Sequence, residues 1–135
     1  MGDNVIYKLS KNFALRIIKL YSYLCDEKKE FIISKQIYRS GTSIGANIAE
    51  SIYAQSDADY INKLKISLKE ASETKYWLEL LYESDIIDDF QFNSLSNDLN
   101  TIIGTTINII NKINKKWIRK FGCWFYLFTF LLFYL

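Results

Sequence analysis

The chain has 135 residues and a formal net charge of only +2, with no proline, no histidine, five glycines and two cysteines. This length supports one domain with its own hydrophobic core, and the scarcity of helix-breaking residues predicts an all-α protein. Without histidine, the usual general base and the Ser-His and Cys-His nucleophile pairs are excluded. Because Cys25 and Cys123 have neither metal-ligand nor redox spacing, we expect a reducing, cytoplasmic location.

The first two predicted helices carry apolar stripes. The first stripe has steps of three and four and ends near Cys25, and its residues are Ile6, Leu9, Phe13, Ile17, Leu20 and Leu24. A charged connector follows at residues 26–30, and Ser34 is predicted to cap the second helix by accepting a bond from a backbone N–H. The second stripe consists of Ile37, Ile44, Ile48 and Ile52.

The third and fourth helices begin at capping signals. Ser56 opens a Ser-x-x-acid sequence, and Asp88 or Asp89 is predicted to open the fourth helix. The third stripe is Ile61, Leu64, Leu68, Ala71, Leu78 and Leu81, and the fourth is Phe92, Leu95, Leu99, Ile102, Thr106, Ile109 and Ile113. Four helices joined by short loops predict an up-down-up-down antiparallel four-helix bundle over residues 4–117, followed by an apolar C-terminal extension at 118–135.

Small side chains are concentrated in the second helix. They are Ser40, Gly41, Thr42, Ser43, Gly45 and Ala46. Because each mid-helix glycine costs about 1 kcal/mol relative to alanine, we expect these positions to allow close approach of another helix or to receive a bulky side chain from it. A phosphate loop is excluded, since the segment lacks both the final Gly-Lys-Ser/Thr and a preceding strand.

Helical spacing places polar side chains together on the second and third helices. The second helix contributes Arg39, Ser43, Asn47 and Glu50, and the third contributes Glu70, Glu73, Thr74 and Trp77. These faces are either solvated surface or a hydrogen-bonded seam, within the bundle or between subunits, in which Arg39 pairs with a glutamate and fixes register and oligomeric state. A di-iron site needs Glu-x-x-His pairs, so we expect no metal, no cofactor and no catalytic residue.

Basic residues gather on the third helix and near the end of the fourth. Lysines on a helix commonly form a solvated face, and Asp59 is placed to pair with Lys63 at i,i+4. Alternatively, these residues neutralise nucleic-acid phosphates. The candidate nucleic-acid-binding residues are Lys63, Lys65, Lys69, Lys112, Lys115 and Lys116.

Two runs of sequence resemble a known family. They are Arg-Ser-Gly-Thr-Ser-Ile-Gly-Ala-Asn-Ile-Ala-Glu, which ends at Glu50, and Lys-Glu-Ala-Ser-Glu-Thr-Lys-Tyr-Trp-Leu, which ends at Leu78. Both are similar to a bacterial four-helix-bundle family encoded in intervening sequences of large-subunit ribosomal RNA genes. The accessory variability proteins of diversity-generating retroelements look like relatives. The resemblance covers roughly residues 5 to 116.

The resemblance implies a homopentamer, as a barrel with a central channel, and no known catalytic activity. It also implies RNA or DNA and a reverse transcriptase as partners, which bind basic surfaces that correspond to Lys63, Lys65 and Lys69. Ser72 departs from the pattern, since many similar sequences have arginine there. We therefore expect a noncatalytic, homo-oligomeric, nucleic-acid-associated accessory protein. The alternative is a structural or membrane-associated interaction module with no nucleic-acid role.

The C-terminal tail, residues 121–135, is uncharged and almost entirely aromatic or aliphatic. As a helix it rises about 22 Å, less than the roughly 30 Å of the hydrocarbon core. Its basic flank, which includes Lys115, Lys116 and Arg119, would suit a membrane-dipping anchor. Packing against the bundle or another subunit is a second interpretation. The interpretation we favour is an accidental extension past a true end near Trp117, encoded by A/T-rich sequence.

Overall fold

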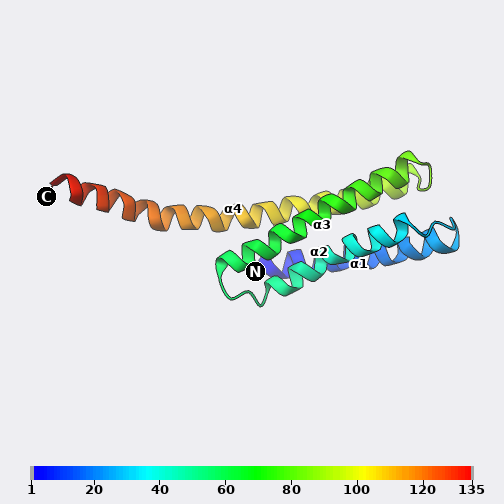
Figure 1. Ribbon diagram of the computed structural model, residues 1–135, viewed down its shortest axis with the longest axis horizontal. Coiled ribbons are helices and arrows are strands. Elements are labelled where there is room, and N and C mark those ends of the chain that lie inside the picture. Colours follow the sequence, from blue (N-terminus) through cyan, green and yellow to red (C-terminus); the bar gives the residue numbers. More distant parts are fainter. Residues whose placement is uncertain (1, 135) are drawn as a thin grey trace.

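A computed structural model describes the backbone of residues 2–134 and the side chains of residues 5–119. It consists of α1 (Gly2–Asp26), α2 (Ile33–Ser51), α3 (Asp57–Glu83) and α4 (Asp89–Tyr134). Helices that follow one another in the chain pack together, and α4 also packs against α1. Successive helices run in opposite directions (Figure 1). The predicted all-α, up-down-up-down antiparallel four-helix bundle is confirmed.

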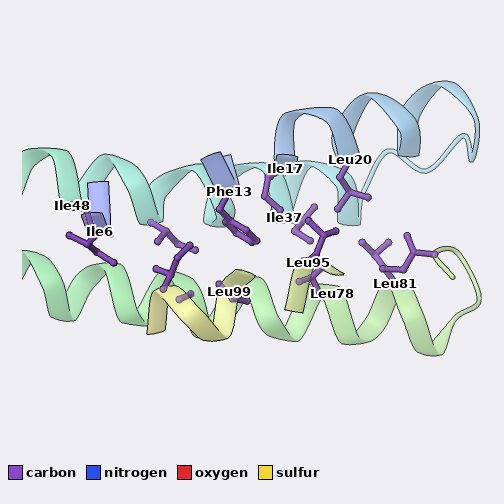
Figure 2. Packing of buried hydrophobic residues seen from close by; sticks show 14 of the residues in the cluster. Ile6, Phe13, Ile17, Leu20, Ile37, Ile48, Leu78, Leu81, Leu95 and Leu99 are labelled. Atoms are coloured by element: carbon purple, nitrogen blue, oxygen red, sulfur yellow. The ribbon is translucent and has the colours of Figure 1, made fainter. Parts of the chain in front are cut away.

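The predicted apolar stripes meet in the centre of the bundle. Figure 2 shows Phe13 and Ile17 among side chains from the other helices, including Leu78 and Leu99. Within the predicted stripes, one position is wrong: Ile52 is 52% exposed, because α2 already ends at Ser51. The remaining residues of the four stripes are buried or half-buried.

A different residue from the predicted one caps α2. The carboxylate of Glu30 accepts bonds from the backbone N–H groups of Ile32 (2.9 Å), Ile33 (2.8 Å) and Ser34 (2.6 Å). Ser34 itself is buried inside α2, and its hydroxyl donates to the Glu30 carbonyl at 2.9 Å, so the predicted Ser34 cap is wrong. Burial favours a higher pKa for Glu30, but the three N–H bonds outweigh it and lower the pKa below its ordinary value.

The other two predicted helix starts are confirmed. Ser56 accepts a bond from the Asp59 N–H at 3.1 Å and caps α3. Asp88 and Gln91 form a reciprocal capping box at the start of α4. In this box the Gln91 N–H donates to Asp88 Oδ1 at 2.8 Å, and the Asp88 N–H donates to Gln91 Oε1 at 3.0 Å.

The glycines of α2 lie against α1. A Cβ added to Gly41 would lie 2.8 Å from Cγ1 of Ile17, and a Cβ added to Gly45 would lie 3.4 Å from the backbone oxygen of Ser10. The predicted role in close helix packing is confirmed for Gly41 and Gly45, whereas Ala46 is exposed and the hydroxyls of Thr42 and Ser43 bond within α2. On the other side of α1, the Arg16 guanidinium donates to Asp98 (2.5 Å) and to Ser94 Oγ (2.7 Å) of α4, which closes the ring of helices.

The last helix is longer than the bundle requires. α4 continues without a break through the predicted domain boundary at residue 117, and Figure 1 shows its C-terminal part extending past the ends of the other helices. Most of the predicted apolar extension, from residue 120 onward, lies outside the described side chains. Within the described part of the chain, no helix has the length and apolarity needed to cross a membrane.

Candidate interaction surfaces

Arg39 of α2 forms an ion-pair cluster with α3. Its guanidinium contacts the carboxylate of Glu73 and lies 3.4 Å from that of Glu70, and the Trp77 indole N–H donates to Glu73 at 3.1 Å. The bonds from Arg39 and then Trp77 lower the pKa of Glu73, and the bond to Glu73 raises the pKa of Arg39. Because the Arg39 side chain is 52% exposed, this cluster lies at the surface and not in the core.

A second ion pair joins the C-terminal end of α2 to the N-terminal part of α3. Lys63 of α3 donates to Glu50 of α2 at 2.5 Å, and this bond raises the pKa of Lys63. The Asp59 carboxylate instead accepts from the backbone N–H of Gln55 at 3.2 Å. The predicted Asp59–Lys63 ion pair does not form, since the amine of Lys63 reaches across to Glu50, and the charge of Asp59 only adds to the rise in the pKa of Lys63.

The predicted polar residues do not form one continuous seam. The Ser43 hydroxyl donates to the Arg39 carbonyl at 2.7 Å, and the Asn47 amide donates to the Ser43 carbonyl at 2.8 Å, so both bond within their own helix. Arg39, Glu50, Glu70, Glu73 and Trp77 are thus brought into two separate groups, one around Arg39 and one at the Glu50–Lys63 pair.

Buried hydroxyls connect α2 and α3 between these two groups. The Ser67 hydroxyl donates to the Ile44 carbonyl at 3.0 Å, and the hydroxyls of Ser40 and Thr74 are hydrogen-bonded at 2.9 Å. Ser40, Ser67 and Thr74 are all buried. Thr74 was predicted as a member of the polar face of α3, and among the described residues of that face it is the one that bonds across the helix interface in the interior. The sequence analysis did not assign Ser40 or Ser67 to this contact, although Ser67 and Thr74 lie seven residues apart in the apolar stripe of α3.

The predicted basic residues differ in how far they are neutralised. Lys63 is paired with Glu50, whereas Lys65 and Lys69 are exposed and make no ion pair with described residues. The same is true of the cationic cluster on α4, which consists of Lys112, Lys115, Lys116 and Arg119 and lines a hollow of about 250 Å³. The Trp117 indole N–H donates to Asp57 at 3.2 Å, which holds this part of α4 beside the start of α3.

Another hollow lies at the opposite end of the bundle and is lined by none of the predicted site residues. It has a volume of about 730 Å³ and lies among Tyr23, Lys28, Tyr82 and the turn between α3 and α4. The Tyr82 hydroxyl donates to Asp89 at 2.7 Å, and this bond raises the pKa of Tyr82. Despite the carboxylates of this turn, the described residues contain no group of three or more metal-ligating side chains.

Comparison with known proteins places this bundle in a family. The profile of the 23S rRNA-intervening sequence protein family matches residues 2–108. A crystal structure at 1.70 Å of a protein of unknown function from the S23 ribosomal protein family of Bacteroides thetaiotaomicron VPI-5482 is 56% identical, with a TM-score of 0.81. That alignment covers 82% of this chain and 99% of the other. No curated protein matches the chain. The chain belongs to the 23S rRNA-intervening sequence protein family.

Proposed function

We propose that the protein is a noncatalytic, homo-oligomeric accessory protein that associates with nucleic acid in the cytoplasm. The observation that carries this proposal is the cationic cluster on α4, whose members are exposed and make no ion pair with described residues. Four cations within about two helical turns favour contact with phosphate oxygens, because each phosphate contact releases condensed counterions.

Lys65 and Lys69 provide a second cationic surface, within the part of the chain that the family profile matches. They are one helical turn apart on α3 and free of the ion pairing that engages Lys63. A homo-oligomer repeats both surfaces around its axis, so that one nucleic-acid molecule contacts several copies at once. This repetition supports binding of a polyanion despite the net charge of only +2.

Exposed apolar side chains between α1 and α2 support self-association. Leu15, Ile18 and Tyr38 are 51%, 40% and 39% exposed, and the rings of Tyr38 and Tyr21 lie 5.0 Å apart. Residues 15, 18 and 21 follow one another at three-residue spacing on one side of α1. Contiguous exposed apolar surface is typical of protein interfaces. The family resemblance favours a pentamer and, through the retroelement relatives, a reverse transcriptase as a partner.

The carboxylates of Glu50, Glu70 and Glu73, which an acid–base enzyme could use, form ion pairs. Glu70 and Glu73 face Arg39, and Glu50 faces Lys63, all at the surface between α2 and α3. Because their charges are paired and the chain has no histidine, the polar groups of the bundle support assembly or binding better than acid–base catalysis.

Gel-shift titration with a structured RNA and a duplex DNA at low salt tests the nucleic-acid half of the proposal. The Lys115→Gln/Lys116→Gln variant is expected to weaken binding about tenfold or more, because it removes two cations that contact phosphate. The Lys19→Gln/Lys35→Gln variant, which removes the same charge from exposed positions nearer the other end of the bundle, is expected to bind like the parent chain. Absence of any retarded complex would overturn nucleic-acid association.

Light scattering tests self-association separately. The parent chain is expected to have a mass several times that of the monomer, and Leu15→Glu/Ile18→Glu is expected to reduce that mass. Circular dichroism checks that the variant remains helical. A monomeric parent chain would overturn the homo-oligomer, and an unchanged mass for a helical variant would remove Leu15 and Ile18 from the interface.

A further inference from the structure

The C-terminal part of α4 leaves the bundle after Trp117. The bond from the Trp117 indole to Asp57 links α4 to α3, and the next residue, Ile118, is already 70% exposed. Beyond this point α4 continues as one helix to Tyr134 and extends away from the other helices without turning back (Figure 1). The backbone of this last part of α4 therefore projects beyond the other three helices.

The sequence of this projecting segment has no polar face. Residues 121–134 contain no charged side chain, and apart from Gly122, Cys123 and Thr129 they are all large aromatic or aliphatic residues. A helix that is apolar on every side requires an apolar environment on every side. A partner helix covers a single stripe, and a bundle of tails from several copies still leaves their outward sides in water, whereas the acyl chains of a bilayer surround the whole segment. This composition favours lipid over a second copy of the chain.

The cationic cluster lies immediately before the apolar segment. Lys112, Lys115, Lys116 and Arg119 are exposed and make no ion pair with described residues, so they are available to anionic headgroups. Cations beside an apolar segment favour a membrane with negative surface charge, and aromatic residues such as Trp124 and Tyr126 favour its interface. The segment rises about 21 Å as a helix, which is enough to enter the roughly 30 Å hydrocarbon core but too short to cross it.

The family match ends before the projecting segment begins. The family profile ends at residue 108, and the solved relative is covered over 99% of its length by only 82% of this chain. The apolar segment at 121–134 therefore lies outside the family match, and substitutions in it test membrane docking without removing the cationic cluster proposed to bind nucleic acid.

We propose that the projecting end of α4 docks the protein on an anionic lipid bilayer. The cationic cluster contacts the headgroup phosphates and carboxylates, and residues 121–134 insert among the acyl chains without crossing the membrane.

Flotation of the full chain with vesicles tests this docking. The chain is expected to float with vesicles of phosphatidylcholine that contain phosphatidylserine and to float much less with phosphatidylcholine alone. Phe128→Asp/Leu131→Asp, which keeps every cation, is expected to abolish flotation. Lys115→Gln/Lys116→Gln, which keeps the apolar segment, is expected to weaken binding about 25-fold, at about fivefold per charge. The matched control Lys65→Gln/Lys69→Gln removes the same charge from α3 and is expected to float like the parent chain.

Insertion is distinguished from aggregation on the vesicle surface by fluorescence quenching. Lipids brominated on their acyl chains are expected to quench the tryptophan emission of the parent chain, and Trp124→Phe is expected to remove most of that quenching. Trp77 and Trp117 remain in this variant as internal references. Failure to float with anionic vesicles, flotation that survives Phe128→Asp/Leu131→Asp, or quenching that survives Trp124→Phe would each overturn the docking.

Gel shifts on the same samples separate the two proposals. An RNA complex without flotation would overturn membrane docking and leave the nucleic-acid role in place. Flotation without any RNA or DNA complex would overturn the nucleic-acid role and leave membrane docking in place.

Discussion

Gly41 of α2 lies directly against Ile17 of α1, at the point where these helices approach most closely among the described glycine positions. A Cβ at position 41 would lie 2.8 Å from Cγ1 and 3.0 Å from Cγ2 of Ile17. Ile17 is fully buried, and both contacting atoms are bonded directly to its Cβ, so a rotation of its terminal methyl group cannot remove the clash. This contact accounts for a glycine at a helical position where alanine would favour the helix by about 1 kcal/mol.

Gly41→Ala is expected to destabilise the bundle, and Gly104→Ala provides its matched control. Nothing lies within 4 Å of a Cβ added to Gly104, so this substitution is expected to stabilise α4 by about 1 kcal/mol. Overpacking against Ile17 is expected to make the free energy of unfolding of Gly41→Ala about 1–3 kcal/mol lower than that of Gly104→Ala. Urea denaturation measures both, and equal stabilities would contradict a tight α1–α2 contact. A destabilised Gly104→Ala would instead indicate that the assembled protein covers this face of α4.

The buried Ser40–Thr74 hydrogen bond is expected to matter more than the exposed Arg39 cluster. Thr74→Val leaves the Ser40 hydroxyl without its bond across the helix interface and is expected to cost about 1–3 kcal/mol, part of which Ser40→Ala should restore. Thr106→Val is the control, because this buried hydroxyl bonds only to the Ile102 carbonyl of its own helix at 2.7 Å. Arg39→Gln is expected to cost less than about 1 kcal/mol, and less still at high salt.

Thermal and urea denaturation of these variants decide between the two contacts. If Arg39→Gln were more destabilising than Thr74→Val, the surface ion pairs would hold α2 and α3 together. Equal costs for Thr74→Val and Thr106→Val would show that the interhelical bond to Ser40 contributes little.

The apolar periodicity of the sequence was sufficient to predict the bundle because burial of a helix face constrains every third or fourth residue. Thus Phe13, Ile17 and Leu99 were placed correctly in the core. Contacts between side chains of two different helices were harder to predict from the sequence, because they depend on how the helices pack. Helical spacing predicted Asp59 as the partner of Lys63, whereas the packing of α2 on α3 brings Glu50 to that amine.

Local capping was predictable where the donor and acceptor are close in sequence and conform to a common pattern. Ser56 and Asp88 follow such patterns, whereas Glu30 reaches forward from a connector and replaces the hydroxyl predicted at Ser34. The surface roles of Lys65 and Lys115 remain predictions, because exposure alone does not select a partner. The fold is thus specified by the repeated spacing of apolar residues, whereas each candidate surface depends on the contacts of a few individual side chains.

The Glu30 cap predicts a pH-dependent contribution to stability. Since the folded-state pKa of Glu30 lies below its ordinary value of 4.5, the stabilisation is fully present above the unfolded-state pKa and is lost as pH falls through the folded-state pKa. Glu30→Gln is expected to lower the free energy of unfolding by about 1 kcal/mol near neutral pH. The difference between parent and variant should shrink once the pH falls below about 4.

Glu27→Gln is the control for this titration, since Glu27 is an exposed acid of the same connector. Denaturation of the three chains at several pH values measures the effect, and Glu27→Gln is expected to follow the parent chain. A stability difference for Glu30→Gln that persisted unchanged in acid would show that the carboxylate charge does not contribute to the cap.

Unpaired lysines are expected to dominate the salt dependence of nucleic-acid binding. Lys65→Gln/Lys69→Gln should reduce the slope of log K against log salt concentration on duplex DNA by about 1.8, if each lysine neutralises one phosphate. Glu50→Gln/Lys63→Gln removes the ion pair without changing the net charge, and its slope is expected to match that of the parent chain. Gel-shift titrations over a range of salt concentrations give all three slopes. A reduced slope for Glu50→Gln/Lys63→Gln would mean that Lys63 leaves Glu50 to bind a phosphate, so the surface would include all three lysines of α3 predicted from the sequence.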